Sequence, residues 1–208
     1  MRILTKFCAT AATLLMAGCG GKVVRPHYYT LETPPARTAA VSGLQIVATV
    51  AVKEFGAPPY LRQGRIVYRQ SPEEIGFYEY RRWAVDPAES ITAAMIESLR
   101  ATGMFPFVKR YDGRNEQDYL LTGRLERLEE VDYGGPVRVN AVVSAELVNL
   151  RTGTTEWTGN ASATFNVETS NVDSVVAQMD RAVQDCIDQL TISMGQRAPV
   201  DSGKERQE

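Results

Sequence analysis

Cys19 is the residue whose type and setting point most directly to chemistry. It closes the run LLMAGC at residues 14–19, and the N-terminus before it carries only Arg2 and Lys6 as charges. A basic start, an apolar middle and small residues before a cut are typical of a secretory signal peptide. Small residues directly before a cysteine narrow this to the lipobox of a bacterial lipoprotein. We therefore expect cleavage before Cys19, a diacylglycerol on its thiol and an acyl chain, such as palmitate, on the new amine.

Two other interpretations compete with lipidation: an ordinary signal peptide with an incidental Cys19, and a transmembrane anchor. The apolar run over residues 7–18 is too short to span a bilayer, because that needs about 20 apolar residues. Gly20, rather than aspartate, follows the cysteine. In Gram-negative sorting this favours the periplasmic face of the outer membrane over the inner membrane. The sequence therefore predicts a protein that is held to a membrane by its first mature residue.

The remaining cysteines and the charge exclude several classes of protein. Cys8 leaves with the signal peptide and Cys186 then has no partner, so a disulfide framework within one chain is excluded. We expect Cys186 to be a small buried residue in a helix, with a reactive thiol as the alternative. The net charge of -2 becomes about -4 after cleavage, because two cations and no acid are removed. Mild acidity without a basic run argues against nucleic acid as a partner.

A search for catalytic residues finds very little. The only histidine, His27, lies near the anchor, and a Ser-His-Asp triad would need it to fold back onto the domain. The paired carboxylates at 73–74 and 129–130 are adjacent strand residues that face opposite ways, so we expect solvated charges. Nucleotide-binding motifs and clusters of metal ligands do not occur. We therefore expect neither an enzyme nor a bound cofactor or metal.

The rest of the chain predicts one α+β domain over residues 43–196. Signal peptide 1–18 and a lipidated tether, 19–42, precede it, and a disordered tail, 197–208, follows it. The tether includes an apolar cluster at 27–31 that is suited to a short edge strand. Alternating apolar residues predict strands over 44–53, 65–69, 74–80 and 105–108. Three longer strands, beginning near Tyr119, Val137 and Glu156, form a meander, with a bulge near Leu128 in the first.

Two helices complete the predicted fold. Asp86 and Pro87 suit an N-cap and a first helical position, Glu89 follows as in a capping box, and Gly103 ends that helix. The second helix covers about 172–194, where apolar residues recur at spacings of three and four. We expect a two-layer sandwich, with a mostly antiparallel sheet and both helices packed on one face.

A second candidate site combines aromatic and arginine side chains in the first half of the chain. These residue types are favoured at protein interfaces, although about half of the aromatic ones are equally explained as core residues of strands. The partner-binding set consists of Tyr28, Tyr29, Tyr60, Leu61, Arg65, Arg69, Arg81 and Trp83.

Four features of the chain together resemble a known family, the ABC-type transport auxiliary lipoproteins, which includes the paraquat-inducible lipoproteins. After the lipobox comes YYTL at 28–31, and then PYL at 59–61 leads into RIVYR at 65–69. Last, YRRWA at 80–84 precedes the first helix. Gly64 departs from the proline expected before the Ile-Val strand, which affects the loop rather than the resemblance.

The resemblance implies a periplasmic α+β domain that serves a transporter built from an ATPase, a permease and an MCE-type substrate-binding protein. Such systems move lipids or other hydrophobic molecules between the two membranes. The auxiliary lipoprotein would dock the MCE-domain protein and hydrolyse nothing, and a homo-oligomer is left open. Two alternatives remain: a periplasmic lipid-binding module with a cleft between sheet and helix, and an assembly lipoprotein of another envelope complex. The residues do not name the cargo.

Overall fold

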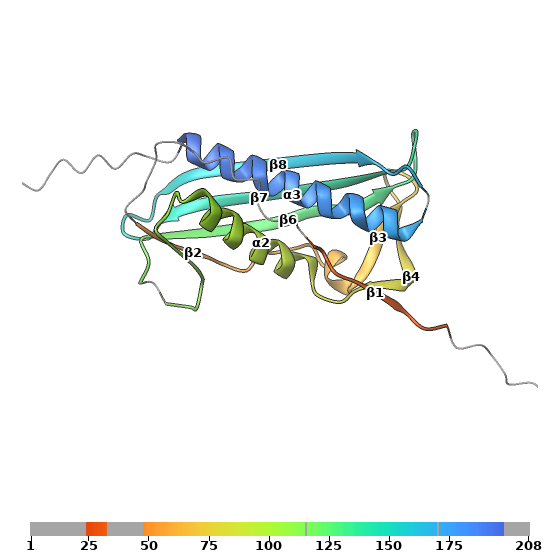
Figure 1. Cartoon of the computed structure of the whole chain (residues 1–208), viewed down its shortest axis with the longest axis horizontal. Helices are drawn as coiled ribbons and strands as arrows, with labels where there is room; N and C mark the ends of the chain where they lie inside the picture. Colours follow the sequence, from red (N-terminus) through yellow and green to blue (C-terminus); the bar gives the residue numbers. More distant parts are fainter. Residues whose placement is uncertain (1–23, 33–47, 115, 170, 198–208) are drawn as a thin grey trace, which may run out of the picture.

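The described residues fold as one sheet of eight strands with two helices on the same side of it (Figure 1). The structure is a computed structural model, and it describes residues 24–32, 48–114, 116–169 and 171–197. The architecture confirms the predicted α+β class with two layers. The predicted signal peptide, the predicted lipidation site Cys19 and residues 198–208 of the predicted tail lie outside the described residues. Within them, no helix is long and apolar enough to cross a membrane.

Strand β6 (Tyr119–Val131) organises the sheet. Along one edge it pairs antiparallel with β7 (Arg138–Asn149), which pairs antiparallel with β8 (Thr155–Asn166), as the predicted meander requires. Two shorter strands share its other edge. β2 (Thr49–Val52) lies parallel to the start of β6, and β3 (Arg65–Arg69) lies parallel to its last two residues. These two attachment points are about 30 Å apart along the strand.

Each attachment point leads to an edge strand. β2 pairs in parallel with β5 (Phe107–Arg110), and we call these two strands the β5 end. β3 pairs antiparallel with β4 (Ile75–Trp83), which pairs in parallel with β1 (His27–Tyr29). These three strands and the short 3-10 helix η1 (Leu61–Gln63) are the β1 end. The sheet is therefore mixed: its long ladders are antiparallel, and its short strands add parallel pairs.

Both helices were predicted at nearly their observed bounds. In α2 (Pro87–Thr102), the Asp86 carboxylate accepts from the Ala88 N–H at 2.9 Å, and Gly103 ends the helix at a φ of 65°. A positive φ of this kind favours glycine because a Cβ atom would be strained there. The second helix, α3 (Val172–Arg197), extends three residues past the predicted end. Ser98 of α2 and Thr191 of α3 meet at 3.3 Å between their hydroxyls.

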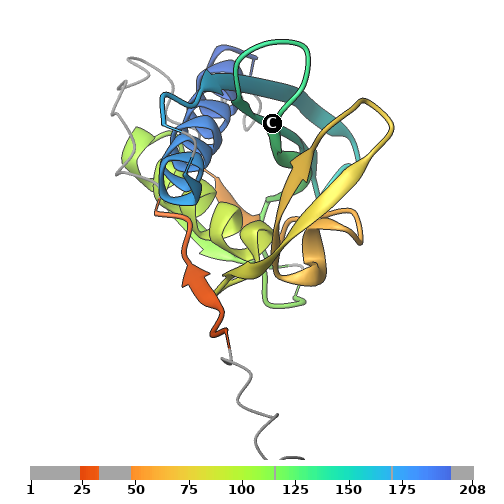
Figure 2. The ribbon, with the colours of Figure 1, turned by 90° about the vertical axis from the view of Figure 1, so that its right-hand side faces the viewer.

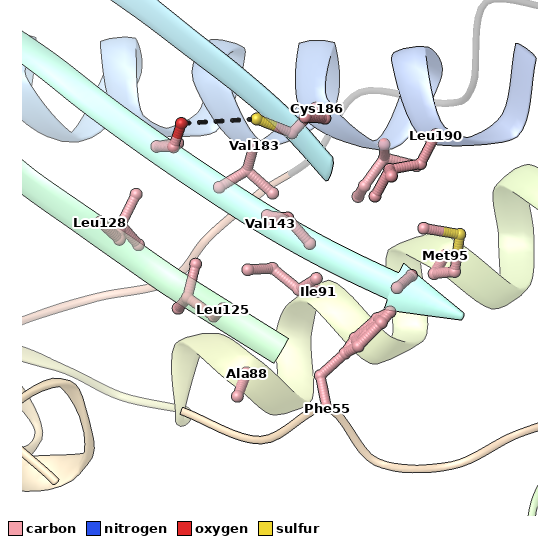
Figure 3. Packing of buried hydrophobic residues seen from close by; sticks show 14 of the residues in the cluster. Phe55, Ala88, Ile91, Met95, Leu125, Leu128, Val143, Val183, Cys186 and Leu190 are labelled. Carbon is pink, nitrogen blue, oxygen red and sulfur yellow. Dashed lines mark hydrogen bonds between the residues drawn. The ribbon is translucent and has the colours of Figure 1, made fainter. Parts of the chain in front are cut away.

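The core lies between the helices and the inner face of the long strands (Figure 3). Ile91 and Met95 of α2 and Val183, Cys186 and Leu190 of α3 are almost fully buried in it. Burial of each large aliphatic side chain stabilises the fold by about 1.5–3 kcal/mol. Cys186 therefore behaves as the predicted small core residue in a helix. Its thiol donates to the Ala141 carbonyl at 3.6 Å, and burial raises its pKa to about 12.

The expected bulge in the first long strand lies between Leu125 and Arg127, close to its predicted place. Just before it, Gly123 allows the Phe55 ring to pack directly on the β6 backbone, since a Cβ atom there would come within 1.9 Å of the ring. Strand β4 runs three residues further than predicted. Strand β5 begins two residues later than predicted, because Phe105 is buried and its ring packs on Tyr119 instead. The first residues of the strand predicted over 44–53 lie outside the described residues.

Candidate functional site at the two ends of the sheet

The β1 end contains seven residues of the predicted partner-binding set, and the eighth, Tyr60, directly precedes η1, but the fold uses most of the set internally. Leu61 and Trp83 are core residues, with 2% and 7% of their surfaces exposed. Trp83 is the last residue of β4, lies beside Tyr29 in register, and donates its N–H to the Gly64 carbonyl at 3.0 Å. Both side chains therefore stabilise the domain and are not accessible to a partner in this structure.

Arg69 is held by a buried ion pair. Its Nε lies 3.0 Å from Oε1 of Glu129, which is only 2% exposed, and its Nη1 donates to the Pro72 carbonyl at 2.7 Å. The expectation that residues 129 and 130 are solvated charges is thus wrong. The other oxygen of Glu129, Oε2, is buried without a hydrogen-bond partner among the described residues. Removal of the arginine would leave this carboxylate buried and unpaired.

Glu130 is buried on the opposite side of β6. It accepts a hydrogen bond of 2.7 Å from the Tyr78 hydroxyl, and burial raises the pKa of both side chains. Strict alternation would leave one of the two neighbouring carboxylates in water. Both are covered because β3 pairs with the last two residues of β6 and β4 pairs with β3, so that Arg69 reaches one face of β6 and Tyr78 reaches the other. Sequence periodicity contains no sign of that pairing.

Three further members of the set make internal polar contacts. The Tyr29 hydroxyl donates to Asp173 of α3 at 2.9 Å and accepts from Arg81 at 2.8 Å, which ties β1 to the helix layer. Burial raises the pKa of Tyr29. The Tyr60 hydroxyl donates to the Glu126 carbonyl at 3.2 Å, beside the bulge, and burial also raises its pKa.

Two members, Tyr28 and Arg65, remain free to contact another molecule. Tyr28 is 63% exposed and lies directly beside Arg82 of β4, which lies opposite Arg65 of β3. We call these three residues the Tyr28–Arg82–Arg65 row; Figure 2 looks onto this end of the sheet. Across the described ranges, neither arginine has a carboxylate within ion-pair distance, and the Nε of Arg82 is buried without an acceptor. Arg82 was not in the predicted set, because its place in this row depends on strand register.

The β5 end has a different exposed aromatic residue. Phe107 begins the edge strand β5, follows Pro106 and is 69% exposed. Its charged neighbours have partners: Arg110 lies 3.9 Å from Glu54, and Lys109 lies 3.4 Å from Asp112. Sequence reasoning missed Phe107 because it placed the residue inside a short strand and considered as interface candidates only the aromatic residues in the first half of the chain.

A hollow of about 460 Å³ lies on the face of β6, β7 and β8 that neither α2 nor α3 covers. Several lining side chains are polar and have hydrogen-bond partners: Thr122 donates to Glu146 of the lining at 3.0 Å, and Ser144 donates to Glu126 outside the lining at 2.9 Å. The cleft expected for a lipid-binding module was placed between sheet and helix, where side chains of the core are packed instead (Figure 3). The open polar hollow does not suit an acyl chain.

Comparisons with known proteins agree with this architecture. The family model described as "ABC-type transport auxiliary lipoprotein component" matches residues 29–191. Among solved structures, protein XCC0632 from Xanthomonas campestris is similar with a TM-score of 0.72 at 16% identity, covering 82% of this chain and 96% of that one. Protein CT253 from Chlamydia trachomatis has a TM-score of 0.53 at 8% identity, covering 75% and 100%. At such identities these structures show the fold alone. A search of curated proteins gave no match.

Proposed function

The chain belongs to the family of ABC-type transport auxiliary lipoprotein components, and we propose that it serves an MCE-type system as a docking protein without catalytic activity. In this proposal it binds the MCE-domain substrate-binding protein while lipids or other hydrophobic molecules cross the periplasm. The family match carries the proposal, since it begins in β1 and ends in α3 and so includes nearly the whole described fold. A filled core and hydrogen-bonded polar groups in the hollow agree with a protein that acts by contact.

We further propose that Cys19 carries the lipid anchor and that the periplasmic face of the outer membrane holds it. The lipobox supports the first point and Gly20 the second. A single acyl chain anchors only marginally, whereas several chains make attachment lasting. Tethering raises the effective concentration of a docking surface at one membrane, which suits a protein that must meet a partner there.

The β5 end is the docking surface that we favour for the MCE-domain protein. β1 begins only eight residues after Cys19, so the β1 end is the side of the domain near the membrane. β2 and β5 lie at the opposite end of the long axis (Figure 1). There, Phe107 offers an exposed apolar ring on an edge strand, and both features favour contact with another protein. Most members of the predicted set are internal, and Tyr28 and Arg65 lie on the membrane side.

The test is purification from membranes with the native anchor kept, followed by identification of the proteins that come with it. We expect an MCE-domain protein among them, and labelled palmitate on the chain itself. A chain that is lipidated but brings no component of an ABC system would overturn the docking role. A chain without label, or one found free in the cytosol, would overturn the anchor.

A further inference from the structure

We propose that the β1 end rests on the bilayer that holds the anchor, and that the Tyr28–Arg82–Arg65 row binds the phosphate groups of phospholipids with a net negative charge. This inference rests on the proposed anchor at Cys19 and adds a second, direct contact between the folded domain and the membrane. The row would then fix the orientation of the domain, which a lipid chain on a tether cannot do by itself.

The short distance along the chain supports this contact. Val24, the first described residue, comes five residues after Cys19. Fully extended, five residues reach about 18 Å. Strand β1 follows at His27 and is fixed to β4 in register, and Tyr29 ties it to α3 through Asp173. The β1 end therefore cannot move far from the headgroup layer while Cys19 is lipidated.

Exposed apolar side chains are concentrated at the same end. Of the six large hydrophobic residues that are exposed in the described part of the chain, four belong to β1, β4 or the residues that flank them: Val24, Tyr28, Tyr80 and Val85. Tyrosine is enriched where a bilayer meets water, because its ring is apolar and its hydroxyl is polar. Aliphatic residues beside tyrosine and arginine fit a surface that touches headgroups without entering the hydrocarbon core.

The two arginines of the row have no carboxylate partner within the described chain. Arg65 and Arg82 lie directly opposite each other on neighbouring strands, and like charges in that position destabilise a sheet. The nearby acids are engaged elsewhere: Asp86 lies 3.9 Å from Arg62, and Asp173 accepts from Tyr29. Phosphate oxygens accept strong hydrogen bonds from guanidinium groups. Since the whole chain has a net charge of -2, this cationic pair is a local feature and not a general basic character.

The experiment uses the intact lipid-anchored protein in nanodiscs of phosphatidylcholine, prepared with and without phosphatidylglycerol. Hydrogen exchange is followed by mass spectrometry in peptides from residues 24–32 and 75–85. We expect exchange there to be several-fold slower with phosphatidylglycerol, because each arginine near an anionic surface strengthens binding roughly fivefold. The double variant Arg65→Gln with Arg82→Gln should lose this difference. The matched double variant Arg151→Gln with Arg181→Gln, which changes two exposed arginines elsewhere, should keep it.

The comparison of the wild-type protein in the two bilayers does not depend on the folding of the variants. Hydrogen exchange in α3 shows whether each variant is folded. Equal exchange of the wild-type β1 end in the two bilayers would overturn the inference. Loss of the MCE-domain protein from the Arg65→Gln and Arg82→Gln variant, without bilayer dependence in the wild type, would show that the row binds an acidic surface of the partner instead. An intact mass without acyl chains would remove the anchor and this inference together, whereas co-purification of the partner tests the docking role separately.

Discussion

The edge strands β1 and β5 are alike in length and pairing, and they differ in the charges around their exposed aromatic residues. β1 and β5 are both short, both pair in parallel with the next strand, and both present an exposed aromatic residue. At β5 that residue is Phe107, and the cations around it have carboxylate partners. At β1 it is Tyr28, beside two arginines without such partners in the described chain. An exposed side chain on an edge strand can contact another molecule. Whether the neighbouring charges are paired indicates the chemistry of the molecule that can bind there.

The two ends also differ in how they are joined to β6. The β1 end is fastened by polar contacts to two buried carboxylates, namely the Arg69–Glu129 ion pair and the Tyr78–Glu130 hydrogen bond. At the β5 end, the pair between Arg110 and Glu54 is exposed. A buried charge that loses its partner costs far more free energy than an exposed one, because water cannot replace the lost contact. The same type of substitution should therefore have very different effects at the two ends.

The largest expected effect is that of Arg69→Ala. It leaves the Glu129 carboxylate buried and unpaired, so we expect the free energy of unfolding to fall by about 3–5 kcal/mol. The matched change Arg110→Ala breaks an exposed pair and should cost no more than about 1 kcal/mol. Urea titration of both variants measures the difference. Equal losses would mean that the two ends are fastened in the same way.

The next effect concerns binding. Phe107→Ser should reduce the amount of MCE-domain protein that co-purifies by a factor of about 30, since a central aromatic residue in an interface contributes about 2 kcal/mol or more. Tyr28→Ser, the corresponding change at the other edge, should leave co-purification nearly unchanged. Both residues are exposed, so the free energy of unfolding should change by no more than about 0.5 kcal/mol. If Tyr28→Ser abolishes capture and Phe107→Ser does not, the assignment of the two ends is reversed.

Local signals were enough to predict the elements of the fold. Asp86, Pro87 and Gly103 mark the ends of α2 in the sequence, and alternation marks β3 and the meander. The contacts at the β1 end could not be predicted in this way. The burial of Glu129 and Glu130 depends on a hairpin from a distant part of the chain, whose strand β3 pairs with the end of β6. The alignment of Tyr28, Arg82 and Arg65 depends on the register of three strands, which alternation within each strand does not determine.

The contact between Asp180 of α3 and the chain after β1 should make the free energy of unfolding depend on pH. The Asp180 carboxylate accepts from the Glu32 N–H at 3.2 Å, and burial raises its pKa from the ordinary 3.8 to about 6. Because the folded protein binds this proton more tightly than the unfolded chain, stability from this group is present at low pH and is lost as the pH rises through 6.

Asp180→Asn should remove this loss and raise the free energy of unfolding at pH 8 by about 1 kcal/mol, an amount that allows for the partial exposure of the group. At pH 4 the variant and the wild type should differ little. Asp185→Asn, an exposed position on the same helix, is the control and should leave the pH profile as it is. Burial also raises the pKa of Glu130, which adds a dependence of the same sign to every variant. An unchanged profile in Asp180→Asn would show that Asp180 is ionised in the folded protein without cost.

The smallest effect tests the charge difference between the two ends directly. In detergent without anionic lipid, Arg65→Gln removes one of two facing cations, so we expect a gain of about 0.5 kcal/mol in the free energy of unfolding. Arg110→Gln at the β5 end removes an attractive contact with Glu54 and should produce a loss of similar size. The test depends on the opposite signs of these two changes in the free energy of unfolding, rather than on their magnitudes. If Arg65→Gln also destabilises the protein in detergent, the Arg65 guanidinium is already satisfied within the chain, and Arg82 would be the only arginine of the row left for a phosphate group to neutralise.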